Sequence, residues 1–221
     1  MPNPDDGSHD DDILNATVLM NFEKTDGGMH NPSWLGTIVE QMPDGRGKII
    51  THNHYEDLRT DYYMFARSDG QFWRKIEASK VDDELASGLS QTREIIVPKN
   101  IMNNYYSPKG HLTPMPLGTP LPGGMASSAD LSAGDPAAVA YLAPPGRGGD
   151  HAEVFHGNVW GIRDDEGTSA AFVASGANPD FAGSGDSGGG LFVRGKHYGN
   201  AWRMGTSPYY GQYGWILALN G

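Results

Sequence analysis

The sequence contains no cysteine, and this absence removes several classes of function at once. Disulfide scaffolds, thiol nucleophiles, thiolate zinc sites and iron–sulfur clusters all need cysteine. Long apolar runs are missing too, because the longest covers only the seven residues 137–143. A helix that spans a bilayer needs about 20 apolar residues. We therefore expect neither a membrane-embedded protein nor a membrane partner.

Basic residues are scarce in this chain. It has 16 Lys and Arg against 27 Asp and Glu, which gives a formal net charge of −11 at pH 7. A surface of this charge repels phosphate backbones, so we expect no nucleic-acid partner. The N-terminus has no basic segment followed by an apolar one, which predicts a cytoplasmic location. A secreted form whose leader has been removed is the alternative.

Glycine (31 residues) and proline (15 residues) are abundant. Short β-branched and aromatic runs alternate with Gly, Pro, Asn and Asp clusters, a pattern typical of all-β proteins. We interpret residues 1–12 as a disordered acidic tail, 13–98 as an N-terminal β-barrel, 99–130 as a connector and 131–221 as a C-terminal β-barrel. Five prolines of the connector are expected to exclude regular strand pairing: Pro108, Pro114, Pro116, Pro120 and Pro122.

A glycine-rich hexapeptide at residues 185–190, Gly-Asp-Ser-Gly-Gly-Gly, carries the strongest chemical signal. A serine that attacks a carbonyl must be exposed, must lie near a base, and needs backbone N–H groups for the developing oxyanion. Glycines beside Ser187 let the chain bend so that the N–H groups of Gly185 and Ser187 point into one hollow. A glycine-rich hairpin turn without chemistry is the alternative interpretation.

A second signal lies far upstream, at residues 49–54, Ile-Ile-Thr-His-Asn-His. Apolar β-branched residues followed by Thr51 and two histidines predict a strand that presents an imidazole at its end. Alternation along the strand puts His52 and His54 on one face, so either is a candidate base and the pair are candidate metal ligands. A zinc site needs a third protein ligand, and the other histidines show no ligand spacing, which disfavours a metal.

Together the two motifs resemble the chymotrypsin-like serine proteases, the trypsin-like family with a double β-barrel. In that family the base lies in Thr-x-x-His and the nucleophile in Gly-Asp-Ser-Gly-Gly, with the histidine first. Residues 51–54 and 185–189 fit these patterns in that order. The resemblance implies an all-β fold of two six-stranded antiparallel β-barrels, with the active site in the cleft between them.

The resemblance also implies a chemistry. The chain is expected to be a serine endopeptidase in which Ser187 attacks the peptide carbonyl and His54 is the base. The N–H groups of Gly185 and Ser187 form the oxyanion hole. This reaction takes a polypeptide substrate and requires no metal or organic cofactor. An esterase acting through the same triad would differ only in its substrate.

Three further residues match the family's substrate-binding positions. Residues 198–202 resemble the strand that pairs with substrate, and Trp202 is its aromatic residue. Phe181 lies six positions before Ser187, where the family has the floor of the pocket for the residue before the cut, and Arg203 adjoins that pocket. Phenylalanine cannot hold Lys or Arg, so we expect cleavage after small, apolar or acidic residues.

No motif marks the acid that orients the imidazole. Asp82 and Asp83 follow one predicted strand and precede the next, and we choose Asp83, 29 residues after His54, as the catalytic acid. A pair of solvated loop aspartates is the alternative interpretation. Asp135 superficially resembles the family's acid, but it opens the strand 137–142, which the second barrel needs in order to close. We interpret Asp135 as a turn residue.

Asp186, beside the nucleophile, raises a separate question. In family members that are activated by cleavage this acid pairs with a freed N-terminal amine, and the sequence has no Ile-Val-Gly-Gly-like activation site. A buried carboxylate needs partners, so Asp186 must find an internal cation or N–H donors. We therefore expect a protease that requires no zymogen cleavage. A catalytically silent protease-fold binding or scaffold module is the alternative function.

Overall fold

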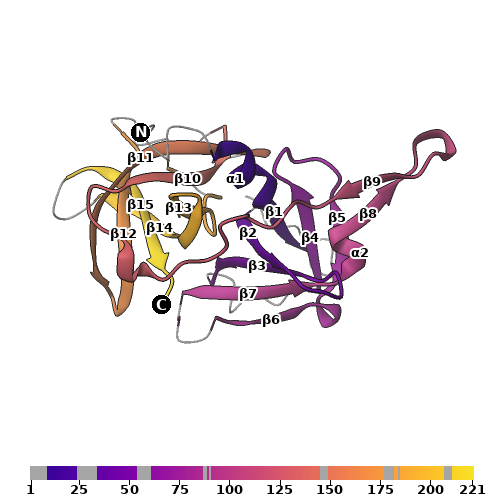
Figure 1. Cartoon of the computed structure of the whole chain (residues 1–221), viewed down its shortest axis with the longest axis horizontal. Helices are drawn as coiled ribbons and strands as arrows, with labels where there is room; N and C mark the ends of the chain where they lie inside the picture. The colour runs from indigo at the N-terminus through magenta and orange to yellow at the C-terminus, as the bar shows by residue number, and fades with distance from the viewer. Residues whose placement is uncertain are drawn as a thin grey trace.

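The computed structural model of the chain describes residues 9–23, 34–53, 61–86, 89, 91–144, 149–176, 182–183, 185–206 and 211–221. Two β units lie side by side, one from each half of the chain, and the short helix α1 (Asp10–Ala16) contacts strands of both (Figure 1). The expected all-β architecture of two barrel-like units is confirmed. Within the described ranges, no helix is long and apolar enough to cross a membrane.

The N-terminal unit is a seven-stranded antiparallel sheet. Its strands are β1 (Thr17–Glu23), β2 (Trp34–Gln41), β3 (Gly47–His52), β4 (Tyr62–Arg67), β5 (Arg74–Glu77), β6 (Asp82–Leu85) and β7 (Thr92–Val97). They pair in the order β5-β4-β1-β2-β3-β7-β6. The two edge strands, β5 and β6, are consecutive in the chain and are joined by the 3-10 turn η1 (Ala78–Lys80), so the sheet curls into a half-barrel.

The strand β6 accounts for the difference between seven strands and the expected six. Its sequence, Asp-Asp-Glu-Leu, has an acidic composition that predicts a loop. Pairing with β7, from Asp82 opposite Ile96 to Leu85 opposite Arg93, overrides that local preference. The aspartates expected in a loop therefore lie in a strand.

The C-terminal unit is a closed six-stranded barrel. Its strands are β10 (Pro136–Ala143), β11 (His151–Asp165), β12 (Thr168–Ala174), β13 (Gly190–Val193), β14 (Lys196–Thr206) and β15 (Tyr213–Leu219). They pair in the order β10-β11-β12-β15-β14-β13, and β10 pairs with β13 to close the ring. Large side chains such as Tyr198 and Trp215 are completely buried in its core.

The two units share an apolar interface. Leu19 and Leu35 of the first unit pack with Leu142 and Ala152 of the second. Burial of apolar side chains from both units in one cluster favours a fixed arrangement of the units. The interface lies beside the turn that leads into β13, where the candidate nucleophile is found.

Helix α1 is not predicted from the sequence. The acidic composition indicates a disordered tail as far as residue 12, whereas the helix starts at Asp10. Acidic residues in a first helical turn are stabilised by the positive end of the helix dipole. Ile13 and Ala16 are buried in a cluster with Phe192 of β13. The buried face of this short helix explains why the last part of the acidic segment is ordered.

The connector contains more regular structure than the sequence predicts. It holds α2 (Lys99–Met102), the hairpin strands β8 (Asn103–Tyr106) and β9 (Thr113–Pro116), and the turns η2 (Pro108–Gly110) and η3 (Ser128–Asp130). The expectation that its prolines exclude pairing is wrong, because Pro114 and Pro116 lie in β9. Each strand of a two-stranded hairpin has an outer edge, where a missing N–H group removes no pairing bond.

Gly188 lies where the two units approach closely. Its φ is +82°, and a Cβ there would be 2.0 Å from the Leu35 carbonyl oxygen and 2.3 Å from Thr51 Oγ1. We expect Gly188→Ala to lower the free energy of unfolding by about 2 kcal/mol or more, since the left-handed conformation alone costs roughly 1–2 kcal/mol. Urea denaturation followed by tryptophan fluorescence measures the loss.

Gly205→Ala is the matched control for this substitution. Gly205 also lies in the C-terminal unit, but a Cβ there would meet no atom within 4 Å. We expect a change of less than about 1 kcal/mol. Equal effects of the two substitutions would contradict the close approach at Gly188.

Candidate active site

Ser187 lies on the turn that leads into β13, and main-chain hydrogen bonds tie this turn to both units. The Ser187 carbonyl oxygen accepts from the N–H of Leu35 in β2 (3.0 Å). On the other side, the Gly188 N–H donates to the Ala201 carbonyl of β14 (2.8 Å), and the Ala201 N–H donates to the Gly189 carbonyl (2.7 Å). Ser187 is partly exposed. The candidate nucleophile is therefore accessible at the junction of the two units.

Leu35 also connects this turn to the strand that carries the histidines. Its carbonyl oxygen accepts from the Thr51 hydroxyl (2.7 Å), while its N–H binds the Ser187 carbonyl. Strand β3 ends one residue later, at His52. The two sequence motifs, far apart in the chain, thus both bind the main chain of Leu35.

His52 is the one candidate base whose surroundings the structure describes. It is fully buried, and the centroid of its ring lies 5.3 Å from that of Trp34. A ring with no exposed surface cannot reach a substrate, so His52 fits a packing role. His54 and the expected pocket residue Phe181 lie outside the described residues.

The carboxylate of Asp186 is buried directly beside Ser187. It accepts from three N–H groups, Leu142 N (2.8 Å), Gly183 N (2.9 Å) and Trp215 Nε1 (2.8 Å). The expectation that this acid finds internal donors is confirmed. Burial raises the pKa of Asp186 to about 6, although the three hydrogen bonds act in the opposite direction. These bonds hold the Ser187 turn to β10 and β15.

Asp83, the expected orienting acid, lies in the interior of β6. It stands opposite Ile95 of β7, whereas His52 at the end of β3 stands opposite Thr92 of the same strand. Three residues of an extended strand span about 10 Å, and β6 lies on the far side of β7 from β3. The structure does not bring Asp83 to the end of β3.

The hydrogen bonds of Asp83 indicate a structural role. Its carboxylate accepts from the Tyr63 hydroxyl and from Nη1 of Arg93 (2.9 Å). Burial and the bond to Asp83 raise the pKa of the Tyr63 hydroxyl, which therefore stays protonated as a donor. Tyr63 belongs to β4, near the other edge of the sheet, so this contact helps to hold the half-barrel curled. The neighbouring Asp82 is exposed.

Neutral groups lie at the end of β3 instead. Thr92, the register partner of His52, is buried and donates its hydroxyl to Oδ1 of buried Asn200 in β14 (3.4 Å). Sequence reasoning misses this link between the units, because neither residue belongs to a recognisable motif. Thr92 and Asn200 thus offer neutral hydrogen-bonding groups, and no carboxylate, beside the end of β3.

Asp135 occupies the turn that opens β10. Its carboxylate accepts from the Ser132 N–H (2.9 Å) and lies 3.4 Å from Nη1 of Arg194. The interpretation of Asp135 as a turn residue is confirmed.

Trp202 and Arg203, the expected substrate-binding residues of β14, form a compact cluster with charged neighbours. Trp202 is buried and packs in one cluster with Phe172. The Arg203 guanidinium lies 4.7 Å from the Trp202 ring centroid and donates to the carboxylates of Asp165 (2.6 Å) and Glu166 (3.1 Å). Its positive charge is therefore offset by two acids at the β11–β12 turn.

Strand β14 has an open edge beyond Ala201 in the described part of the chain, because the Ala201 main chain is still bound by Gly188 and Gly189. Strand β13 pairs with β14 only as far as Asn200, while β15 pairs with it as far as Thr206. A β-bulge between Ala201 and Arg203 shifts the register within this segment. An open antiparallel edge can accept an extended peptide as an additional strand.

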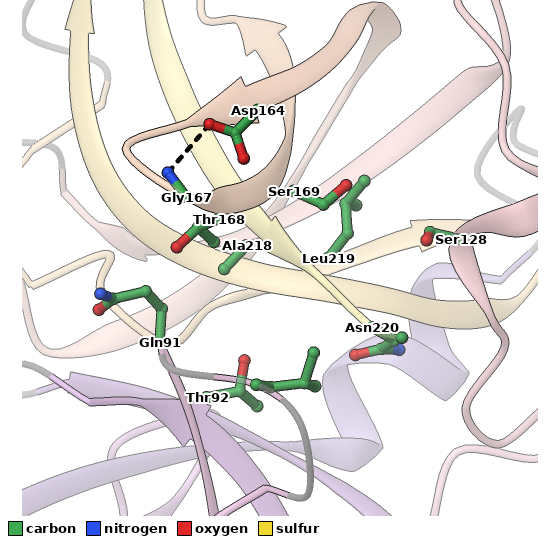
Figure 2. Close-up of a pocket in the computed structure, with 12 residues that line it drawn as sticks. Gln91, Thr92, Ser128, Asp164, Gly167, Thr168, Ser169, Ala218, Leu219 and Asn220 are labelled. Atoms are coloured by element: carbon green, nitrogen blue, oxygen red, sulfur yellow. Dashed lines mark hydrogen bonds between the residues drawn. The ribbon is translucent and has the colours of Figure 1, made fainter.

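A polar pocket of about 380 Å³ adjoins the start of β7 (Figure 2). Gln91 and Thr92 form one wall, and the β11–β12 turn forms another, where the Gly167 N–H donates to the Asp164 carboxylate (2.9 Å). Ser187 does not line this pocket. The pocket is therefore separate from the candidate nucleophile.

No protein-family profile and no curated protein sequence matches the chain. Solved structures do match. AlgW, an HtrA-type protease solved with a decapeptide, has a TM-score of 0.57 and 13% identity over 99% of this chain and 64% of that one. Human heparin binding protein has a TM-score of 0.57 and 11% identity over 95% and 87%. A thermostable serine protease, AL20, from an extremophilic microorganism has a TM-score of 0.56 and 13% identity over 94% and 92%.

These likenesses establish the fold. All three proteins share the double-barrel architecture of chymotrypsin-like proteins, and this chain has the same fold. The chain spans about 64% of the length of AlgW. At such low identities the match supports a shared fold and does not show a shared activity.

The buried carboxylate of Asp186 predicts a pH-dependent stability. A folded-state pKa of about 6, above the ordinary 3.8, means that the folded protein holds this proton more tightly than the unfolded chain does. Raising the pH from about 4 to about 7 therefore removes stability through this group, on the order of 2–3 kcal/mol. We expect the unfolding free energy of the wild type, relative to Asp186→Asn, to fall over this range in urea titrations.

Subtracting the unfolding free energy of Asp186→Asn from that of the wild type cancels the titration of the groups that the two proteins share. Glu153→Gln provides a contrast of opposite sign, because hydrogen bonds from Tyr141 and His151 lower the pKa of Glu153. The wild type should gain stability over Glu153→Gln as the pH rises. A difference between the wild type and Asp186→Asn that stays constant with pH would contradict the raised pKa.

Proposed function

We propose that this chain is a serine endopeptidase that works through an acyl-enzyme. Ser187 attacks the scissile carbonyl carbon, and the His54 imidazole takes its proton and returns it to the leaving amine. Water then hydrolyses the acyl ester and regenerates the serine. The observation that carries the proposal is the accessible position of Ser187 at the junction of the barrels, bound through Leu35 to the Thr51 end of β3.

The oxyanion binds to the N–H groups of Gly185 and Ser187. Gly185 has a φ of +102°, a conformation that glycine adopts without strain. Asp186, between these residues, is held by three internal N–H donors. This internal support favours a turn that is ordered without a freed N-terminal amine, so the enzyme requires no zymogen cleavage.

The substrate is a polypeptide that pairs with the open edge of β14. The solved structure of AlgW holds a decapeptide, which fits a peptide groove in this fold. From its position six residues before Ser187, we assign Phe181 to the floor of the pocket for the residue before the cut, and Trp202 supports β14. The acids Asp165 and Glu166 offset the charge of Arg203, so the expected preference narrows to small and apolar residues before the cut.

The imidazole works without help from Asp83. That carboxylate is bound by Tyr63 and Arg93 and lies away from the end of β3. The neutral Thr92 hydroxyl lies opposite His52 instead. A serine and histidine without an aligned acid retain part of the catalytic power of a complete triad, because the oxyanion hole and substrate binding remain.

A catalytically silent binding module is the second candidate, and the position of Asp83 favours it. Human heparin binding protein shares the fold, and its name describes binding. The net charge of −11 disfavours a polyanionic partner for this chain. The reactivity of the serine separates the two functions.

A fluorophosphonate probe tests the nucleophile. We expect labelling at Ser187 in the wild type, and neither labelling nor peptide cleavage in Ser187→Ala. The melting temperature should change by only a few degrees, because the side chain is partly exposed. His54→Ala should lose activity to a similar extent, since the nucleophile and its base act as a unit. His52→Ala should keep labelling and lose stability, because His52 is buried.

Each outcome of this labelling experiment has a meaning. An unlabelled wild type supports the silent module. Labelling together with ester hydrolysis but no peptide cleavage supports an esterase. Full activity of Ser187→Ala would overturn the mechanism.

Asp83→Asn tests the orienting acid. We expect an unfolding free energy lower by about 1–3 kcal/mol, because hydrogen bonds to a charged group are lost. We expect kcat/KM to stay within about tenfold of the wild type. Asp82→Asn, the exposed neighbour, is the control and should leave both quantities unchanged. A folded Asp83→Asn variant with turnover reduced on the order of 10⁴-fold would instead identify Asp83 as the acid.

A further inference from the structure

The hairpin formed by β8 and β9 extends away from both barrels (Figure 1). Among the strands that the structure describes, β8 and β9 pair only with each other, and a two-stranded hairpin alone is marginally stable in water. Its base is fixed by the buried guanidinium of Arg74, which donates to the Ile101 carbonyl (2.6 Å) and to the Met115 carbonyl. The hairpin is therefore held as a defined projection from the N-terminal unit.

Large apolar side chains gather on this projection. On the hairpin, Tyr105 is 59% exposed, Tyr106 is 50% exposed and Leu112 is 74% exposed. The turn before β5 adds Phe72 and Trp73, and the Phe72 and Tyr106 rings lie 5.3 Å apart, centroid to centroid. Tyr105 and Tyr106 are adjacent in β8, so their side chains lie on opposite faces of the hairpin, with Tyr106 on the side of Phe72. We call these five residues, which cover both faces, the hairpin patch. Clustered exposed aromatic residues mark interaction surfaces, whereas scattered ones do not.

The backbone at Phe72 carries strain that serves the hairpin patch. Phe72 has a φ of +58°, in the left-handed region that bulky residues rarely adopt. Its side chain is 38% exposed, so the strain does not place it in the core. Strained backbone persists at sites where it positions a functional group. Here it presents an aromatic ring beside Tyr106.

Three of the five residues of the hairpin patch, Tyr105, Tyr106 and Leu112, lie in a positive segment of an acidic chain. Residues 99–129 contain Lys99, Lys109 and no Asp or Glu. Their formal charge is +2 against −11 for the whole chain, which leaves −13 on the remainder. Complementary charge favours an acidic partner surface. The remainder of the same chain is acidic overall.

The C-terminal barrel offers a matching surface. Strand β11 exposes Trp160 (39%) and Ile162 (37%) and ends with Asp164 and Asp165, and Glu166 follows in the turn. We call this the β11 patch. The β11–β12 end of the barrel and the hairpin lie at opposite ends of the molecule (Figure 1), so the hairpin of one copy does not reach its own β11 patch.

We propose that this chain associates head to tail, with the hairpin patch of one copy seated on the β11 patch of the next. Aromatic side chains pack on Trp160 and Ile162, and Lys109 faces Asp164, since Asp165 and Glu166 are already bound by Arg203. A contact between two different surfaces is heterologous, so it builds a ring or an open chain rather than a simple two-fold dimer. This inference is independent of the proposed protease activity.

Sedimentation velocity over a series of protein concentrations tests the association. We expect the wild type to form species heavier than the 23.8 kDa monomer, and added salt to weaken them because charges contribute. The double substitution Tyr105→Ser with Tyr106→Ser should weaken association by about tenfold or more, since aromatic residues dominate interface energies. Leu85→Ser, at an exposed apolar residue of β6 outside both patches, is the control and should associate like the wild type.

A charge exchange tests the pairing of the two patches. Lys109→Glu and Asp164→Lys should each associate less than the wild type, and a mixture of the two should recover association. Far-UV circular dichroism verifies that each variant is folded. The proposal is overturned if the wild type stays monomeric at all concentrations. It is also overturned if Lys109→Glu and Asp164→Lys both associate as strongly as the wild type. Binding of the wild type to neutral phosphatidylcholine vesicles that is lost in the double tyrosine variant overturns it too, because this result assigns the hairpin patch to a lipid surface.

Discussion

The main chain of Leu35 sets the geometry of the junction between the barrels. Its N–H binds the carbonyl of Ser187 and its carbonyl binds the hydroxyl of Thr51, while its side chain is buried in the interface with Leu142. The close approach of Gly188 to the same carbonyl leaves no room for a Cβ. One residue thus fixes the spacing between the serine turn of one barrel and the histidine strand of the other.

The burial of the Asp186 carboxylate follows from the position of the Ser187 turn at Leu35. The turn that reaches Leu35 carries Asp186 into a buried site, where dipoles rather than a cation stabilise the charge. The arginines discussed above are engaged elsewhere: Arg93 binds Asp83 and Arg203 binds two acids at the β11–β12 turn. A partly protonated acid next to a nucleophile is the consequence of burying a carboxylate with N–H partners alone.

Local motifs predict what depends on a few consecutive residues. The glycine-rich hexapeptide and the Thr51 segment indicate the double-barrel fold and the meeting of two distant segments, and Gly-Asp-Pro indicates a turn at Asp135. The role of Asp83 is not predictable in this way, because it depends on the register of β6 against β7 and on a bond to Tyr63 of β4, near the opposite edge of the sheet. The Thr92–Asn200 contact likewise arises only when both barrels are assembled.

The bulge between Ala201 and Arg203 has a consequence for how this fold can vary. Ala201 stands opposite Leu217 of the barrel core, whereas Arg203 stands opposite Ile216, which belongs to a separate cluster. The extra residue reverses the inward and outward alternation of side chains along β14. Beyond the bulge, inward and outward positions along β14 are therefore exchanged relative to the alternation before it. Mutations at the outward position Arg203 can diversify recognition, whereas Met204, which stands opposite Trp215, packs against the core of the barrel and is constrained by it.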